Sequence, residues 1–122
     1  IFATGHLVWP ALEAAKLLYE EGIEAEIINI HTIKPLDKKA VLESVWKTGC
    51  AVTAEEHLMN GGLGDSIAQL LSLEEPSPLE MVAVDDKFGE SGTPEQLMVK
   101  YGLDVPHIVE AAKKAIERKK KS

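Results

Sequence analysis

The stretch CAVTAEEHLMNGGLGDSIAQLL, residues 50–71, decides the fold of this chain. Its first five residues are mostly apolar or β-branched and predict a short strand. A glycine-rich loop at 60–62 follows, and apolar residues then recur at helical spacing over 64–73. Another apolar run at 79–84 predicts the next strand. A strand, a helix and a strand in this order are typical of two parallel strands joined by a crossover helix.

The same alternation continues toward the N-terminus. Residues 1–4 are expected to form a strand, and an apolar stripe over 7–18 predicts a helix that Gly22 ends. A run rich in isoleucine at 25–31 then predicts another strand of the kind that is buried in a parallel sheet.

A further helix is expected between these strands and the central segment. Asp37 is placed to cap a helix over 38–47, and Gly49 is placed to end it. Trp9 and Trp46 lie among apolar neighbours on predicted helices, so we expect both indoles to pack in the interior.

Two helices are predicted after the last strand. Residues 93–96 read Thr-Pro-Glu-Gln, which is a typical helix start with a capping threonine and a glutamine three positions later. Gly102 is expected to end this helix, and Asp104 to cap the final one, with Pro106 in its first turn. Strands and helices thus alternate along the whole chain, which predicts a layered α/β/α sandwich around a mostly parallel sheet.

Composition limits the classes of function. The chain has 122 residues, which suits one domain, and its net charge of −7 argues against nucleic-acid binding. The basic cluster at 118–121 is expected to complement the dipole of a final helix. No apolar run is long enough to span a membrane, and the single cysteine, Cys50, favours a reducing, cytoplasmic compartment. Because Ile1 already lies within an expected strand, we interpret residues 1–122 as one domain of a longer chain.

The glycine-rich loop between strand and helix is a place where phosphates often bind. It lacks the Gly-Lys-Ser/Thr ending of a P-loop, and Ile67 stands where a dinucleotide-binding motif needs its third glycine. Asp65 would also repel a phosphate at the helix start. A tight turn that lets two backbones approach closely, at an interface, is the alternative that the sequence favours.

Two other motifs are weighed and set aside. Glu55, Glu56 and His57 follow a strand end, but adjacent side chains diverge and cannot all face one metal ion. Residues 88–92 superficially resemble a serine nucleophile elbow around Ser91, yet a threonine occupies the last glycine position of that motif. A triad of Ser91 and His57 with Asp85 stays open as an alternative, as does a hydrogen-bonded interface cluster.

Taken together, several segments resemble the C-terminal domain of transketolase, in the form in which that enzyme is split into two polypeptides. The segment at 33–37, Ile-Lys-Pro-Leu-Asp, and the Gly-Glu-Ser-Gly segment at 89–92 resemble transketolase more than its relatives. Those relatives are deoxyxylulose-phosphate synthase and the β subunits of 2-oxoacid dehydrogenases. The resemblance extends over nearly the whole chain, through stretches at 3–5, 11–18, 21–23, 31–37, 52–57, 61–64, 88–92 and 101–103, together with Leu97.

The resemblance implies a three-layer sandwich with a five-stranded mixed sheet, one strand running antiparallel to the others. It also implies a cytoplasmic, homodimeric enzyme of carbohydrate metabolism and the pentose phosphate pathway. Such enzymes transfer a two-carbon ketol unit between sugar phosphates with thiamine diphosphate and Mg²⁺ or another divalent cation. The cofactor is held by the pyrimidine- and diphosphate-binding domains, which would be the partners of this chain. No segment here matches the Gly-Asp-Gly motif that holds the metal and diphosphate, so no catalytic, cofactor or metal role is assigned to any residue.

We therefore expect an assembly domain that is inactive alone and that enlarges the dimer contact. The loops at 55–64 and 88–93 both follow strands and should emerge at one sheet edge. The expected interface residues are Glu55, Glu56, His57, Gly61, Gly62, Gly64, Glu90 and Ser91. Two alternatives remain: a stand-alone regulatory module that binds anions at the glycine-rich loop, and a hydrolase based on Ser91.

Overall fold

The computed structural model describes residues 1–31, 35–56, 62–84 and 93–121. The elements in chain order are β1 (Phe2–Ala3), the 3₁₀ helix η1 (Gly5–Leu7), α1 (Val8–Glu20), β2 (Ile28–Asn29), α2 (Lys38–Thr48), β3 (Ala51–Glu56), α3 (Leu63–Glu74), β4 (Leu79–Val84) and α4 (Pro94–Lys121). The predicted strand at 79–84 is confirmed with the same bounds, and the strands predicted at 1–4 and 25–31 are confirmed as shorter strands within those segments. The strand predicted at 50–54 is confirmed as β3, which extends two residues farther and includes Glu55 and Glu56.

The strands form one parallel sheet in the order β2-β1-β3-β4. Phe2 of β1 lies opposite Ile28 of β2 and opposite Thr53 of β3, so the first strand occupies an interior position of the sheet. The parallel α/β arrangement is as predicted. The described residues contribute four strands, all parallel, and the fifth, antiparallel strand of the expectation is not among them.

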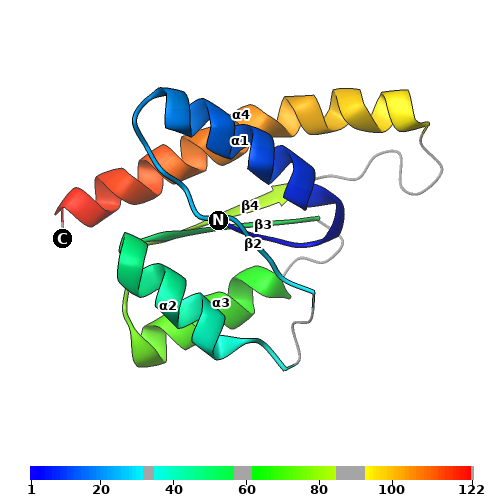
Figure 1. The fold of residues 1–122 in the computed structure, drawn as a ribbon. Helices are drawn as coiled ribbons and strands as arrows, with labels where there is room; N and C mark the ends of the chain where they lie inside the picture. The colour runs from blue at the N-terminus through cyan, green and yellow to red at the C-terminus, as the bar shows by residue number, and fades with distance from the viewer. Residues whose placement is uncertain (32–34, 57–61, 85–92, 122) are drawn as a thin grey trace.

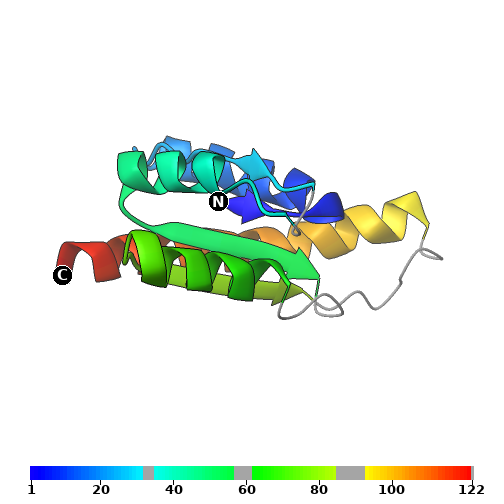
Figure 2. The ribbon, with the colours of Figure 1, turned by 90° about the horizontal axis from the view of Figure 1, so that it is seen from below.

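Helices cover both faces of the sheet (Figure 1). One face packs against α1 and α4, through a layer that includes Ala3 and Ala54 from the strands. The other face packs against α2 and α3, and Phe2 and Ala51 belong to that layer. Seen from below in Figure 2, α2 and α3 lie nearest the viewer, in front of the strands. The structure is therefore the three-layer sandwich that the alternation of elements predicts.

Local signals set the helix ends where the sequence places them. Gly22 has φ of +82°. Its N–H donates to the Tyr19 carbonyl at 3.0 Å, while the Ile23 N–H donates to the Leu18 carbonyl at 2.9 Å. This pair of bonds is a Schellman motif, which satisfies carbonyls that the end of α1 leaves open. At the start of α2 the Asp37 carboxylate accepts from the Ala40 N–H at 3.1 Å, as an N-cap residue does.

The last helix corrects the prediction of two helices. The capping box forms as predicted, because the Thr93 hydroxyl accepts from the Gln96 N–H at 3.1 Å and the Gln96 side chain accepts from the Thr93 N–H at 2.9 Å. The helix then continues through Gly102 and Pro106 to Lys121. Gly102 is not among the glycines with positive φ.

Packing explains why this helix continues through two residues that usually break one. Beyond Gly102, the buried stripe Val105, Ile108, Ala112 and Ala115 lies against the sheet and α1. Burial of such a stripe stabilises the helix by more than the single hydrogen bond that a proline removes.

Trp46 contradicts the expectation of interior packing, because 60% of its surface is exposed. Its indole N–H donates to the Glu75 carboxylate at 2.9 Å, so the side chain joins the end of α2 to the residue that follows α3. Trp9 is 37% exposed and therefore also lies at the surface in part. Within the described ranges, no helix has the length and apolar character that crossing a membrane requires.

Candidate functional site

The carboxyl end of β3 carries the feature on which the site depends. Glu55 is only 4% exposed, although it is an acidic residue near the end of a strand. One carboxylate oxygen, Oε2, accepts from the Leu63 N–H at 2.9 Å, and the other, Oε1, accepts from the Gly64 N–H at 3.2 Å. Glu55 therefore supplies the cap that the first turn of α3 lacks in its own sequence.

The alternation of β3 explains why this carboxylate points at α3. Ala51 packs in the layer of α2 and α3, and successive side chains of a strand point to opposite faces. Thr53 and Glu55 therefore face the same layer as Ala51. A carboxylate next to the N–H groups at a helix start gains from the positive end of the helix dipole as well as from the hydrogen bonds. Together these interactions offset the cost of burying a charge.

Gly64 lies under Met81 of the neighbouring strand β4. A Cβ atom at Gly64 would come within 2.6 Å of the Met81 sulfur and within 3.3 Å of Glu55 Oε1. Only glycine fits this position without a shift of its neighbours. The glycine thus serves a close approach between α3 and the sheet, and no positive φ is involved.

This arrangement bears directly on whether the loop binds anions. A phosphate at a helix start needs free backbone N–H groups. Here the N–H groups of Leu63 and Gly64 already donate to Glu55, and Asp65 adds an exposed negative charge in the first turn of α3. A bound phosphate would have to displace a buried carboxylate, so the geometry disfavours an anion site at these two N–H groups.

The predicted interface residues fall into three groups. Glu55 and Gly64 are buried in the chain, where they fix the start of α3. Glu56 and Gly62 are partly exposed, at the end of β3 and at the N-cap of α3. The remaining residues, His57, Gly61, Glu90 and Ser91, lie outside the described residues.

The other chemistry weighed from the sequence gains no support from the geometry. All members of the alternative triad, Ser91, His57 and Asp85, lie outside the described residues. In the part of the chain that the structure describes, no three His, Cys, Asp or Glu side chains are grouped so that they could hold a metal ion.

A cavity of about 620 Å³ lies at the opposite edge of the sheet, where the strands begin. Apolar side chains such as Leu18, Val52 and Ala115 line it. Two lysines also line it, and both are engaged: Lys47 lies 3.0 Å from the Glu26 carboxylate, and Lys119 donates to the Thr48 carbonyl at 2.7 Å.

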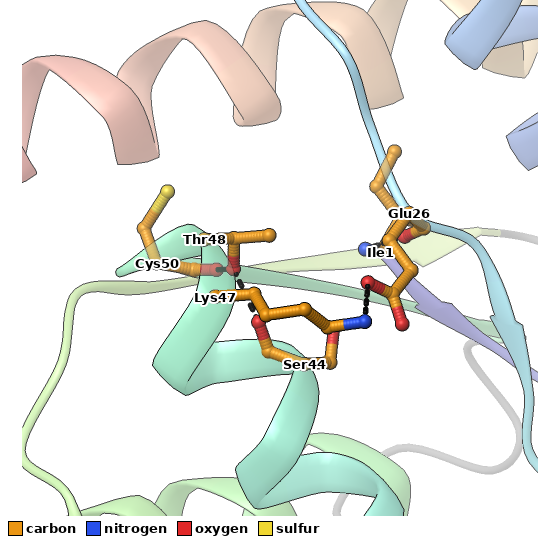
Figure 3. A network of polar contacts seen from close by, with 6 residues as sticks. All are labelled: Ile1, Glu26, Ser44, Lys47, Thr48 and Cys50. Atoms are coloured by element: carbon orange, nitrogen blue, oxygen red, sulfur yellow. Dashed lines mark hydrogen bonds and ion pairs between the residues drawn. The ribbon is translucent and has the colours of Figure 1, made fainter.

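Figure 3 shows the polar contacts at this edge. The Ile1 backbone nitrogen donates to the Glu26 carbonyl at 2.8 Å. The Thr48 hydroxyl lies 2.8 Å from the Ser44 carbonyl and 3.0 Å from that of Cys50. Burial raises the pKa of the Cys50 thiol, which keeps it in its less reactive protonated form. These hydrogen bonds and the ion pair connect separate segments of the chain, and they do not place a nucleophilic side chain next to a base.

Sequence reasoning missed the structural roles of two residues that complete the site, because their partners are not adjacent in the chain. The interface role predicted for Glu55 stays a prediction, and the sequence does not reveal that its carboxylate accepts from N–H groups eight and nine residues later. Met81 carries no motif, and only the pairing of β3 with β4 brings it over Gly64. The one available signal was the order of an acidic strand end followed by Gly-Leu-Gly at 62–64.

Comparison with known proteins places this geometry in a family. The chain is 49% identical over 119 residues to the 6-deoxy-6-sulfo-D-fructose transketolase subunit SqwH of Clostridium sp. (strain MSTE9), covering 98% of this chain and 37% of that protein. It is 40% identical over 113 residues to 1-deoxy-D-xylulose-5-phosphate synthase 1 of Geobacter sulfurreducens, covering 91% of this chain and 18% of that protein.

A solved structure described as a split gene transketolase, inactive beta4 tetramer, is similar with a TM-score of 0.78 and 46% identity, covering 95% of this chain and 38% of that one. The chain thus spans well under half the length of these relatives. The family model for the C-terminal domain of transketolase matches residues 1–108. The chain therefore belongs to the transketolase C-terminal domain family.

Proposed function

We propose that this chain is the non-catalytic assembly domain of a thiamine diphosphate-dependent transketolase. The observation that carries the proposal is the use of Glu55 to satisfy the start of α3 from within the chain. At the sheet edge where α/β proteins commonly bind ligands, the two N–H groups that could hold an anion are committed to structure. What this edge supplies is a fixed helix start and the partly exposed residues Glu56 and Gly62 beside it.

In the proposed enzyme, a two-carbon ketol unit moves between sugar phosphates, in the cytoplasm and as part of the pentose phosphate pathway. Thiamine diphosphate and Mg²⁺ would bind to the pyrimidine- and diphosphate-binding domains, as partners on the same or a separate polypeptide. The described residues here do not fit that cofactor, because a diphosphate needs free N–H donors or a metal held by several oxygen ligands. The chain belongs to a family that includes subunits of split enzymes, which supports the assignment of cofactor binding to other domains or subunits.

The proposed assembly is a homodimer of the whole enzyme, with the carboxyl edge of the sheet at the contact. The similarity to a subunit that is described as forming a tetramer supports association between chains of this kind. The expected interface still comprises the eight residues from Glu55 to Ser91 named above. Glu55 and Gly64 would act by positioning the loop, and the others by contact. A fifth, antiparallel strand in a mixed sheet remains part of the proposal.

A second candidate is the equivalent domain of deoxyxylulose-phosphate synthase. It is favoured by the 40% identity to the enzyme of Geobacter sulfurreducens. The role of the domain would be the same in both enzymes. The two candidates differ in the reaction of the whole protein, so assaying the assembled enzyme for ketol transfer between sugar phosphates, and separately for synthesis of 1-deoxy-D-xylulose 5-phosphate, distinguishes them.

The assembly role is tested with Gly62→Val in the complete enzyme. A β-branched side chain at this partly exposed position should weaken dimerisation by about tenfold or more, while turnover per assembled enzyme stays unchanged. Gly102→Ala is the matched control, because a Cβ atom there meets nothing within 4 Å. Sedimentation and steady-state turnover are measured on both variants. Normal dimerisation combined with a lost turnover would reject the assembly role.

A further inference from the structure

Met81 is a methionine that combines exposure to solvent with a structural contact. It lies on β4, which is the last strand on its side of the described sheet, and 56% of its surface is exposed. An exposed thioether is accessible to peroxides dissolved in water, which convert it to a sulfoxide. Met81 is therefore open to oxidation in the folded chain.

The same side chain covers the start of α3. The Met81 sulfur lies 2.6 Å from the point that a Cβ atom at Gly64 would occupy, and Glu55 Oε1 lies 3.3 Å from that point. The Gly64 N–H donates to this carboxylate oxygen. The sulfur, the glycine and the buried carboxylate therefore meet at one place, where α3 is fixed to the sheet.

The pairing of β3 with β4 explains why the sulfur reaches this place. Met81 lies opposite Thr53 in the parallel ladder, and Thr53 faces the layer of α2 and α3. Side chains at paired positions of neighbouring strands point to the same face of a sheet. A shift of the register by one residue would turn Met81 to the other face. The contact with Gly64 is thus a property of the sheet and does not depend on a loop.

Oxidation changes both the size and the polarity of this side chain. The sulfur attacks one oxygen of a hydroperoxide and keeps it, the O–O bond breaks, and the other oxygen leaves with the proton as water or an alcohol. The sulfur is oxidised and the peroxide is reduced. The gap at Gly64 does not admit a methyl group, so the new oxygen does not fit there either. Its partial negative charge would also be repelled by the Glu55 carboxylate.

We propose that Met81 is a modification site for hydroperoxides, and that its sulfoxide loosens the start of α3. The oxidised side chain leaves Gly64 and turns to water. The hydrogen bonds from Leu63 and Gly64 to Glu55 then lose their cover, and a hydrogen bond is weaker in water than in a dry, low-dielectric interior. Sulfoxide reductases regenerate the thioether, so the change is reversible.

Amide hydrogen exchange, followed by NMR before and after treatment with hydrogen peroxide, tests the proposal. Mass spectrometry establishes that Met81 has gained one oxygen. The Leu63 and Gly64 amides should then exchange faster by about tenfold or more. Methionine sulfoxide reductases should restore the slow exchange. The Ile30 amide, which donates to the Ala3 carbonyl at 2.9 Å between β1 and β2, is the internal control and should not change.

Met81→Leu is the matched variant, because leucine is apolar, similar in volume and free of sulfur. This variant retains Met59, Met98 and Cys50, so peroxide acts on the same other sulfur atoms as in the wild-type chain. Peroxide should leave amide exchange at the start of α3 unchanged in this variant. If Met81→Leu fails to fold, the Met59→Leu/Met98→Leu chain decides, because Met81 is its sole methionine.

Three results would overturn the proposal. The first is a Met81 side chain that stays reduced in the folded chain under conditions that oxidise methionine in a short peptide. The second is complete oxidation of Met81 with unchanged exchange at the Leu63 and Gly64 amides. The third is equal acceleration in the wild-type and Met81→Leu chains, because the effect would then come from another residue.

Discussion

The Glu55 carboxylate accepts a hydrogen bond of 2.9 Å from the backbone N–H of Leu63, which opens helix α3. A strand residue thereby caps the helix that follows it, across a loop that separates the two in sequence. The other oxygen of the Glu55 carboxylate accepts a hydrogen bond of 3.2 Å from the Gly64 N–H. The start of α3 is thus fixed to the sheet by the Glu55 carboxylate, which is buried and therefore not accessible to a ligand.

Removal of this carboxylate should destabilise the chain markedly. Glu55→Ala leaves two N–H groups without their acceptor, and we expect a loss of about 2 to 4 kcal/mol in the free energy of unfolding. Glu55→Gln keeps one acceptor oxygen and should lose about half as much. Glu56→Gln, at the partly exposed next position, is the control and should change stability by less than about 0.5 kcal/mol. Urea denaturation followed by circular dichroism measures all three, and equal stability of Glu55→Ala and wild type would refute the capping role.

Thr53→Val should leave the chain as stable or make it more stable, by about 1 kcal/mol. The Thr53 side chain is fully buried, and its hydroxyl oxygen has no hydrogen-bond partner within the described structure. The same substitution at Thr48 is the matched comparison, because that hydroxyl bonds to the carbonyls of Ser44 and Cys50. Thr48→Val should lose about 1 kcal/mol in the same denaturation experiment. A clear loss at residue 53 would mean that its hydroxyl is satisfied in solution.

Gly64 and Met81 should show strong coupling in a double-mutant cycle. Gly64→Ala alone introduces a methyl group within 2.6 Å of the Met81 sulfur, and it should cost about 1 to 2 kcal/mol of stability. In the Met81→Ala background that contact is gone, and the better helix propensity of alanine should cancel or reverse the loss. Thermal and urea unfolding of the four chains give the coupling energy. Additive effects would show that the packing of Met81 on Gly64 has no energetic weight.

Features whose partners are near in sequence could be predicted from the sequence. Gly22 ends α1 and Asp37 begins α2 as expected, because each acts on backbone groups only a few residues away. The order of strands and helices follows from hydrophobic periodicity for the same reason. Gly102 is the exception, since the long-range packing of α4 on α1 and the sheet overrides its local tendency to end a helix.

Only the position of the site along the chain could be predicted from the sequence. The sequence directs attention to the carboxyl end of β3 and the glycines after it, but the roles of Glu55 and Met81 depend on distances that no local pattern contains. Trp46 illustrates the same limit, because apolar neighbours in sequence do not reveal which side of α2 faces solvent.

In the proposed enzyme, the chemistry resides in partner domains and not in this chain. Isothermal titration of the purified chain with thiamine diphosphate and Mg²⁺ tests this division most directly, with the assembled enzyme as the positive control. We expect saturable binding by the assembled enzyme and none by this chain alone. Saturable binding of thiamine diphosphate by the isolated chain would contradict the account.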